Sequence, residues 1–388
     1  MKREFSLNTI IQTLQDVLPK NREFIALHEP LFNGNEWTYV KDCLDTGWVS
    51  SVGQYVDRFE QQLADYTGIK YAVAVVNGTA ALHICMQLTG VSVGDEVIIP
   101  ALTFVATANA VSYCGAIPHF VDSEARSLGL DPYKLADYLD EICELRLEGC
   151  FNKKTGRRIR AVVPMHTFGH PVDMDPLAEV CRKFRLELIE DAAESVGSFY
   201  KGVHTGNWGR LSVLSFNGNK IVTSGGGGAI LTNDEILARL AKHLSTQAKL
   251  PHPWSFNHDM VAYNYRMPNI NAALGCAQLE QLPEFIEKKR GMAKRYQEVF
   301  AEVEGVKIFE EASYACSNYW LNVLLLSEEY YEERDNLLGL SNRQGIMTRP
   351  AWSLIHRLSM YKNCPRMDLS GAESLERRLI NLPSSVFL

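Results

Sequence analysis

Short apolar segments alternate with stretches of helical periodicity through the middle of this 388-residue chain. Seven segments have the composition of strands buried on both faces of a sheet: Tyr71–Val76, Glu96–Ile99, Pro118–Val121, Ala161–Pro164, Glu187–Glu190, Ser212–Phe216 and Ala229–Leu231. Helical spacing marks the intervening segments Ala80–Thr89, Ala106–Tyr113 and Pro176–Phe184, the last preceded by Asp175 as its cap. This alternation predicts an α/β fold in which a mostly parallel, seven-stranded sheet carries helices on both faces.

The pattern changes after about residue 280, which indicates a second, smaller α+β unit. It contains a long charged helix, two strands and a late helix, expected at Leu282–Val303, Trp320–Leu326, Ile346–Arg349 and Ser374–Asn381. A helix near Leu7–Leu18 is expected to pack beside this unit. The predicted division is an N-terminal segment 1–35, a large domain 36–280 and a small domain 281–388.

Composition excludes several classes of function. The net charge of −7 provides no basic field for nucleic acid. No apolar run approaches the ~20 residues of a membrane span. The nine cysteines form no Cys-x-x-Cys pair and no zinc spacing, which favours a reducing, cytoplasmic location. His166 and His170 have the spacing of a helical metal pair, but the glycine and proline beside His170 argue against a helix, so no metal site is expected.

The pair Asp191 and Lys220 points most directly to chemistry. Asp191 ends a predicted strand, and Lys220 lies in the loop that follows another. Taken singly, the aspartate is explained as a cap and the lysine as an ordinary loop residue. Together they supply what pyridoxal phosphate needs, namely an amine that holds its aldehyde as a Schiff base and a carboxylate that keeps its pyridine nitrogen protonated.

A phosphate anchor is predicted where the first strand gives way to a helix. Gly78 and Thr79 stand at that turn, and the first N–H groups of a helix together with its dipole attract anions. An ordinary turn is the simpler explanation of this segment alone, but Asp191 and Lys220 favour the anchor. Ser215 precedes Lys220 by five residues, close enough for its hydroxyl to help hold the same phosphate.

Two further side chains are candidates for contacts with the cofactor ring. Phe104 follows a strand end and could stack on a pyridine ring, although core packing is the alternative. Glu194, three residues after Asp191, could contact the ring oxygen or the substrate. The glycines 225–228 allow either a sharp turn or a close approach to a ligand.

With these motifs in place, the chain resembles the sugar aminotransferases of the DegT/DnrJ/EryC1/StrS family, which have the fold type I architecture of aspartate aminotransferase. The resemblance extends from about Ile25 to Ser385. It rests on Gly47–Gly53, Asn77–Leu82, Pro100–Phe104, Glu190–Ser195, Ser215–Lys220 and Tyr263–Met267. Two departures concern substrate contacts: Glu194 stands where many members have glutamine, and the glycine segment lacks the usual acidic residue.

The resemblance implies a role for each candidate residue. Lys220 and Asp191 would be catalytic, with pyridoxamine 5'-phosphate as the intermediate form of the cofactor. Phe104 would stack on the ring, Glu194 would lie near it, and the phosphate would be held by Gly78, Thr79 and Ser215. Asn264 would reach the phosphate from a second subunit, since family members are homodimers with shared active sites.

The resemblance also implies a substrate class. Leu27–Trp37 and Ser215–Lys220 look like the branch that acts on UDP-4-keto-6-deoxy-N-acetylhexosamine, as in legionaminic acid and bacillosamine synthesis. The expected reaction moves an amino group from glutamate to the C4 ketone of such a nucleotide sugar, releasing 2-oxoglutarate, for cell-surface polysaccharide or lipopolysaccharide. Substrate contacts are expected among His166, Trp320, Arg349 and His356, for each of which a structural role is the alternative.

Other functions stay open at this point. A GDP-linked 4-keto-6-deoxymannose, giving perosamine, is the alternative substrate. Relatives that dehydrate C3 of the sugar replace the Schiff-base lysine with histidine, so Lys220 argues against that reaction. In a different class, a pyridoxal phosphate-binding regulator without turnover usually carries a basic DNA-binding module, and none is visible. A nicotinamide oxidoreductase lacks its glycine fingerprint here.

Overall fold

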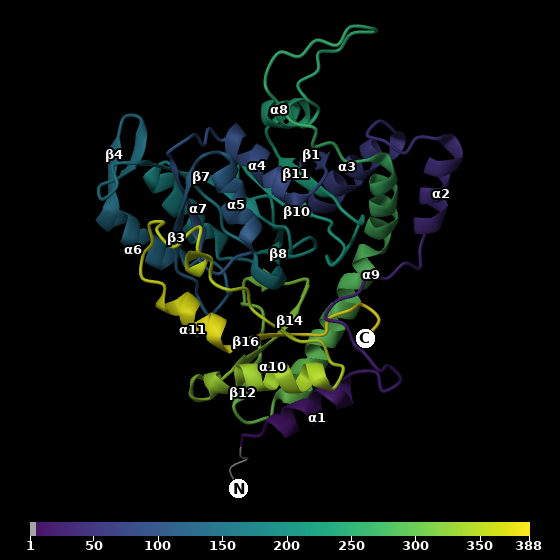
Figure 1. Cartoon of the computed structure of the whole chain (residues 1–388), viewed down its shortest axis with the longest axis vertical. Helices are drawn as coiled ribbons and strands as arrows, with labels where there is room; N and C mark the ends of the chain where they lie inside the picture. The colour runs from purple at the N-terminus through teal and green to yellow at the C-terminus, as the bar shows by residue number, and fades with distance from the viewer. Residues whose placement is uncertain (1–4) are drawn as a thin grey trace.

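The computed structural model describes residues 5–388, and its centre is a nine-stranded mixed sheet (Figure 1). Seven strands run side by side in the order β1 (Tyr71–Val75), β11 (Gly228–Thr232), β10 (Leu211–Ser215), β7 (Glu187–Asp191), β6 (Arg158–Val162), β2 (Glu96–Pro100) and β3 (Ile117–Val121). The hairpin β4 (Cys143–Arg146) and β5 (Gly149–Asn152) joins this path through β6. All seven predicted strands are present, and the predicted fold class is confirmed.

Strand direction brings the functional segments to one edge of the sheet. β10, β7, β6, β2 and β3 pair in parallel. β11 is antiparallel to both of its neighbours, so β1 points the same way as β10. Six strands therefore end at the same edge, where parallel sheets usually bind ligands.

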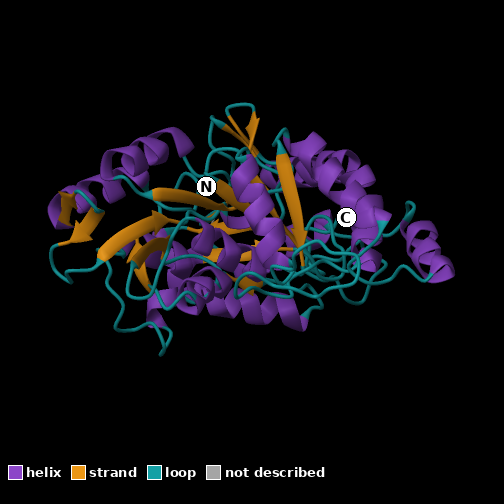
Figure 2. Ribbon diagram, turned by 90° about the horizontal axis from the view of Figure 1, so that it is seen from above, coloured by secondary structure: helices purple, strands orange, loops and turns teal. Residues whose placement is uncertain are grey.

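Helices cover both faces of the sheet (Figure 2). One face carries α3 (Gln54–Thr67), α4 (Gly78–Leu88), α5 (Val105–Tyr113) and α8 (Glu235–Ser245); the other carries α6 (Pro132–Ile142) and α7 (Met174–Phe184). Strand side chains alternate between these faces with the period of two that the pleat imposes. Val97 and Ile99 of β2 join the apolar cluster of one face, and Ile98 joins that of the other.

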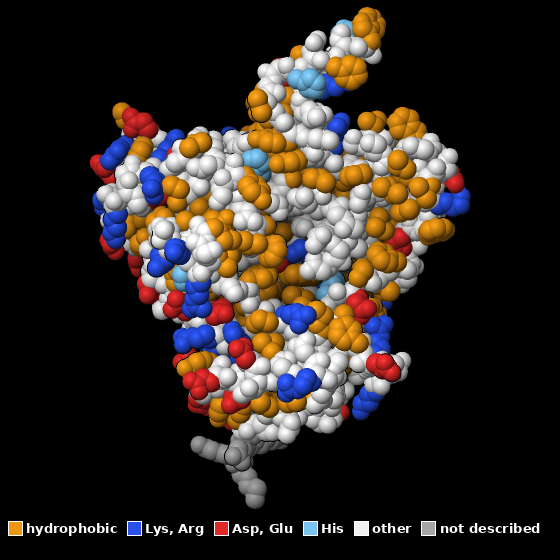
Figure 3. Space-filling model, in the orientation of Figure 1, with side chains coloured by type: hydrophobic (Ala, Val, Ile, Leu, Met, Phe, Trp, Pro, Cys, Tyr) orange, Lys and Arg blue, Asp and Glu red, His pale blue; other side chains and the backbone are white. Residues whose placement is uncertain are grey.

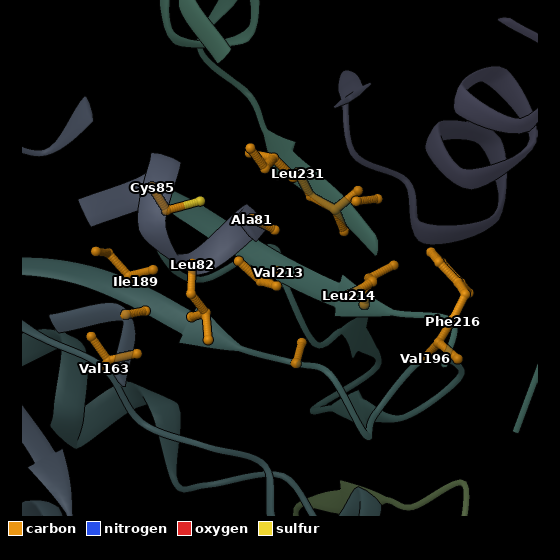
Figure 4. Packing of buried hydrophobic residues seen from close by; sticks show 14 of the residues in the cluster. Ala81, Leu82, Cys85, Val163, Ile189, Val196, Val213, Leu214, Phe216 and Leu231 are labelled. Carbon is orange, nitrogen blue, oxygen red and sulfur yellow. The ribbon is translucent and has the colours of Figure 1, made fainter. Parts of the chain in front are cut away.

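The α4 face forms the largest apolar core (Figure 4). Ala81, Leu82 and Cys85 of α4 belong to the same fully buried cluster as Val213 of β10 and Leu231 of β11. Burying such side chains contributes about 1.5–3 kcal/mol each. Since α4 carries the predicted phosphate turn at its start, this packing fixes the position of that turn.

The start of α7 differs from the prediction. The helix begins at Met174 with Asp173 at its cap position, and Asp175 lies inside the first turn. The carboxylate of Asp175 is instead paired with Lys201. The helix therefore starts two residues earlier than predicted, and Asp175, the residue expected to cap it, pairs with Lys201 instead.

A second, four-stranded sheet lies below the first in Figure 1. Its order is β12 (Val306–Ile308), β14 (Asn322–Leu326), β16 (Leu379–Leu382) and β15 (Arg349–Pro350), accompanied by α10 (Arg334–Arg343) and α11 (Ser370–Arg378). The N-terminal helix α1 (Leu7–Val17) packs against α9 (Asn269–Phe300) and α10. Ile10 and Leu14 of α1 share an apolar cluster with Tyr296 and Leu324.

The expected late helix is a helix followed by a strand. α11 ends at Arg378, and the apolar run Leu379–Leu382 forms β16, which pairs with β14 and β15. The remaining strands β8 (Phe199–Tyr200), β9 (Val203–His204) and β13 (Ala315–Cys316) form a small third sheet, and 3₁₀ turns lie at Thr167–Gly169, Glu328–Glu333 and Ile355–Arg357.

Helix α9 begins well before the predicted Leu282. Its first half buries small side chains such as Ala272, Ala273 and Cys276 beside α2 (Glu36–Thr46) and α3, so the charged periodicity of an exposed helix is absent there. The proposed domain boundary at residue 280 therefore passes within a continuous helix. No helix among residues 5–388 has both the length and the apolar composition needed to cross a membrane.

Candidate active site

A cavity of about 340 Å³ opens at the edge where the parallel strands end. The face in Figure 3 is hollowed near its centre. Eight of the predicted site residues line this cofactor cavity: Gly78, Thr79, Phe104, Asp191, Glu194, Ser215, Lys220 and Trp320. They come from positions 78 to 320 of the chain, and the sheet topology brings them together.

Asp191 closes β7 and is almost fully buried. Its Oδ2 accepts a 2.7 Å hydrogen bond from the hydroxyl of Thr107, and its Oδ1 accepts one of 3.3 Å from the backbone N–H of Ala193. Burial raises the pKa of the Asp191 carboxyl, and the Thr107 hydrogen bond opposes that rise. A carboxylate held this way in a dry site has a strong preference for a cationic partner.

Lys220 follows β10 and projects into the same cavity. Its Nζ lies 3.1 Å from Oε1 of Glu194 and 4.1 Å from the ring centroid of Trp320. Its side chain is 12% exposed, so the amine is reachable from the cavity but largely shielded from water. This is an environment for a reactive amine rather than for a surface charge.

The predicted phosphate turn lies at the start of α4. The Asn77 side chain caps α4 by accepting the Ala80 N–H at 2.8 Å. Gly78 and Thr79 are the first two residues of this helix, and their N–H groups are among those that have no partner within a helix. Ser215 lies against this turn, since a Cβ added to Gly78 would meet its Cβ at 3.2 Å. A Cβ on Gly228 would stand 2.5 Å from the backbone of Asn77, so glycine is needed at the start of β11.

Phe104 and Trp320 form aromatic walls. Phe104 is 47% exposed and meets Trp352 edge-on at a centroid distance of 6.0 Å. Trp320 donates its indole N–H to the backbone oxygen of Asn219 at 2.7 Å, which fixes the ring. Trp320, Trp352 and Asn219 also line a second cavity of about 450 Å³, which therefore adjoins the cofactor cavity.

The second cavity contains Arg349 and His28. Arg349 is exposed and donates to neutral oxygens of Asn342 and Thr348, both at 3.2 Å. Both ring nitrogens of His28 are buried and lack a hydrogen-bond partner among the described residues. Burial and the nearby Lys289 lower the pKa of His28 well below its usual value, so its ring is neutral.

Two predicted substrate contacts lie elsewhere. His166 is fully buried: its Nε2 lies 3.1 Å from Glu190, and its Nδ1 accepts the N–H of Val172 at 3.2 Å. His356 is nearly buried beside Phe120, with Nε2 3.6 Å from Glu373. Neither side chain lines either cavity, so the structure places both in the supporting framework, contrary to the expected substrate contact.

Asn264 lies outside the cavity of its own chain. It is exposed on the excursion between α8 and α9, where its Oδ1 accepts from the Arg266 guanidinium at 2.9 Å. This excursion projects beyond α8 in Figure 1. Asn264 therefore does not line the cofactor cavity of its own chain.

Residues that the sequence did not single out complete the site. Thr107 supports Asp191, Trp352 forms a wall, and Asn219 anchors Trp320. Thr107 stands three residues after Phe104, and Trp352 stands three residues after Arg349. Neither spacing is a known sequence motif for a cofactor or substrate site. Their roles depend on contacts between distant segments.

The donor set of the cofactor cavity fits pyridoxal phosphate. Lys220 offers an amine for the aldehyde, buried Asp191 an anion for a protonated ring nitrogen, and the start of α4 an anion site. Gly228 provides the close backbone approach that this turn requires. No group of three or more potential metal ligands gathers within residues 5–388.

Comparison with known proteins agrees with this chemistry. The family model of the DegT/DnrJ/EryC1/StrS aminotransferase family matches residues 31–388. The chain is 36% identical to GDP-perosamine synthase of Vibrio cholerae, covering 93% of this chain and 94% of that protein. It is 38% identical to GDP-perosamine synthase of Caulobacter vibrioides, covering 93% of each.

A solved structure supports the same assignment. The aminotransferase TlmJ from Streptoalloteichus hindustanus superposes with a TM-score of 0.84 at 29% identity, covering 94% of each chain. Fold, cavity chemistry and sequence relatives therefore agree. The chain belongs to the DegT/DnrJ/EryC1/StrS aminotransferase family and is a pyridoxal phosphate-dependent sugar aminotransferase.

Proposed function

We propose that this enzyme transfers the amino group of glutamate to the C4 ketone of GDP-linked 4-keto-6-deoxymannose, forming GDP-perosamine. The choice of substrate rests on the similarity of this chain to two GDP-perosamine synthases, at 36% and 38% identity over 93% of its length. The product serves cell-surface polysaccharide.

This proposal replaces the UDP-linked substrate expected from the segments Leu27–Trp37 and Ser215–Lys220. Leu27 and His28 line the second cavity, but Phe32 and Trp37, at 54% and 74% exposure, lie on the surface. In the second motif, Ser215, Asn217, Asn219 and Lys220 line the cofactor cavity. Neither motif distinguishes a UDP-linked from a GDP-linked sugar by these positions, and the named relatives favour the GDP-linked one.

We assign the catalytic roles as follows. Lys220 would hold the cofactor through its aldehyde, and its free Nζ would move the proton of the donor's α-carbon. When bound, pyridoxal phosphate supplies an electron sink for the charge left by that proton. Asp191 would keep the ring nitrogen protonated, and Gly78, Thr79 and Ser215 would hold the phosphate. A positioned proton carrier of this kind contributes roughly 10²–10⁴ in rate.

The second cavity is the proposed substrate site. Aromatic faces of Trp320 and Trp352 suit the apolar face of a sugar ring, and Arg349 suits a carboxylate or phosphate. This cavity shares Asn219, Trp320 and Trp352 with the cofactor cavity that Lys220 lines, so a sugar seated in it would lie next to the proposed cofactor site.

We propose a homodimer with shared active sites. The excursion after α8 exposes Trp254, Phe256 and Val261 at 79%, 76% and 91%, an apolar surface that a second copy would cover. Apolar side chains are visible on this excursion in Figure 3. The same excursion carries Asn264, which would reach the partner's phosphate turn. We also propose a cytoplasmic location, which suits nine unpaired cysteines.

The test is turnover with a panel of substrates. Purified enzyme is incubated with glutamate and, separately, with GDP-, UDP- and dTDP-linked 4-keto-6-deoxy sugars, and amino-sugar products are identified by mass spectrometry. Amination of the GDP-linked sugar with the highest kcat/KM supports the proposal. Preference for a UDP- or dTDP-linked sugar contradicts it, and Lys220→Ala serves as the inactive control.

A further inference from the structure

Glu194 is the acidic group in contact with the reactive lysine. Its side chain is 2% exposed, and its Oε1 lies 3.1 Å from Lys220 Nζ. Its second oxygen, Oε2, accepts the backbone N–H of Phe168 at 2.9 Å. Oε2 of Glu194 is thus hydrogen-bonded to the backbone of Phe168, and Oε1 contacts Nζ of Lys220.

The contact with Phe168 fixes the carboxyl in place. Phe168 has a left-handed backbone (φ 55°) in the turn Thr167–Gly169, a conformation that a bulky residue rarely adopts. Its ring lies 4.9 Å from that of Trp352. Glu194 and the aromatic wall therefore hold this turn jointly, and Glu194 cannot swing away from Lys220 without losing the Phe168 N–H.

We propose that Glu194 is the acid–base partner of Lys220: while Nζ is free of the cofactor, the Glu194 carboxylate takes a proton from the ammonium and leaves a neutral amine. In this step one N–H bond of Lys220 breaks and one O–H bond of Glu194 forms, and the reverse step returns the proton. No electrons are transferred.

Lys220 needs a proton acceptor, and a buried carboxyl beside it can serve as one. An ordinary lysine amine is protonated at neutral pH and cannot accept the α-proton of the donor until it loses that proton. Transfer to Glu194 turns a poorly hydrated ion pair into a neutral pair, which a dry cavity favours. Burial raises the pKa of the Glu194 carboxyl to about 7, so its protonated form is accessible at neutral pH.

One further charge and one aromatic ring lie close to the Glu194–Lys220 pair. Asp191, at the end of β7, disfavours a second anion and so assists protonation of Glu194, whereas the charge of Lys220 opposes it. The Trp320 ring, just before β14, lies with its centroid 4.1 Å from Lys220 Nζ. Glu194 is thus the group whose protonation changes near pH 7 at the reacting amine.

The first test reads the proton directly. Infrared difference spectra of the cofactor-free protein, recorded between pH 5 and pH 9, are expected to show a buried carboxyl band that titrates with a midpoint near pH 7. The band is expected to disappear in Glu194→Gln. It is expected to persist in the control variant Glu60→Gln, because Glu60 pairs with a different lysine: its Oε1 lies 2.6 Å from Nζ of Lys242. A spectrum of Glu194→Gln identical to wild type overturns the proposal.

The second test separates proton exchange from structural support. Glutamine keeps an oxygen for the Phe168 N–H but cannot exchange a proton, so Glu194→Gln is expected to bind pyridoxal phosphate normally. Its single-turnover reaction with glutamate at pH 7 is expected to slow by roughly tenfold to a hundredfold, and the pH profile to lose its change near pH 7. An unchanged rate and profile contradict the acid–base role.

The inference rests on Lys220 being the cofactor-binding amine. Peptide mapping of wild type and Glu194→Gln after borohydride reduction distinguishes the two claims. A label at another residue refutes the assignment of Lys220. A label at Lys220 combined with a wild-type pH profile in Glu194→Gln refutes the role of Glu194 alone.

Discussion

The hydroxyl of Thr107, in the first turn of α5, donates a 2.7 Å hydrogen bond to Oδ2 of Asp191 at the end of β7. Thr107 is fully buried, and its Oγ1 also lies 3.2 Å from that of Thr103. Burial alone would favour the protonated form of Asp191, and this hydrogen bond favours the ionised form. The ionised form of Asp191 is therefore supported by a threonine that does not itself line the cofactor cavity.

Replacing Thr107 by valine removes this hydrogen bond at nearly constant volume. A hydrogen bond to a charged group is worth about 1.5–3 kcal/mol, so we expect transamination to slow by about ten- to a hundredfold. Single-turnover kinetics with glutamate measure the change. Thr13→Val, which alters an exposed helix hydroxyl, is the control. Equal rates in the two variants would show that Asp191 needs no support from Thr107.

Glu194 also predicts a pH dependence of stability in the cofactor-free protein. Its pKa rises from 4.5 to about 7 on folding, so the folded state binds more protons than the unfolded state in that window. Stability from this group is present below pH 4.5 and is lost as the pH rises to 7, by about 3 kcal/mol at most. Urea unfolding of Glu194→Gln should lack this loss. A parallel pH dependence in wild type and variant would contradict the assignment.

Gly228 tests the phosphate turn. A methyl group there would stand 2.5 Å from the Asn77 backbone carbon, so Gly228→Ala must displace the turn. We expect a loss of about 1–3 kcal/mol in stability, as for other overpacked sites, and weaker binding of pyridoxal phosphate. Gly226→Ala is the matched control, because a Cβ there meets nothing within 4 Å. Fluorescence titration with the cofactor should separate the two variants.

Mixed dimers test the shared active site. Lys220→Ala and Asn264→Ala are each expected to be nearly inactive alone. If Asn264 acts across the interface, a hybrid dimer contains one site with both native residues, and a refolded equimolar mixture should recover about a quarter of wild-type activity. No recovery, with hybrids verified by mass spectrometry, would place Asn264 and Lys220 in the same subunit's site or remove Asn264 from the site.

The sequence was sufficient to bring candidate site residues near strand ends into one cavity. Asp191 is the last residue of β7, Gly78 lies three residues after β1 and Lys220 five after β10, and these strands end at one edge of the sheet. The fold class followed from the same pattern. Its single antiparallel central strand, β11, was not predictable from periodicity, because a strand buried on both faces looks the same in either direction.

Contacts between distant segments set the limit of sequence reasoning. His166 resembles a ligand-binding histidine in the sequence, but Glu190, itself held by the backbone N–H groups of Gly206, Trp208 and Gly209, fixes its ring inside the framework. Thr107 resembles an ordinary helix residue yet supports Asp191. Burial and pairing decided both roles, and neither can be derived from residue type and spacing.

The most direct test of the central claim is to locate the cofactor covalently. Wild-type enzyme saturated with pyridoxal phosphate is reduced with borohydride, digested, and analysed by mass spectrometry, with Lys220→Ala treated in parallel. The account predicts the reduced cofactor on Lys220 in wild type and no labelled peptide in the variant. Labelling of a different lysine in wild type, or an equally labelled Lys220→Ala protein, would contradict it.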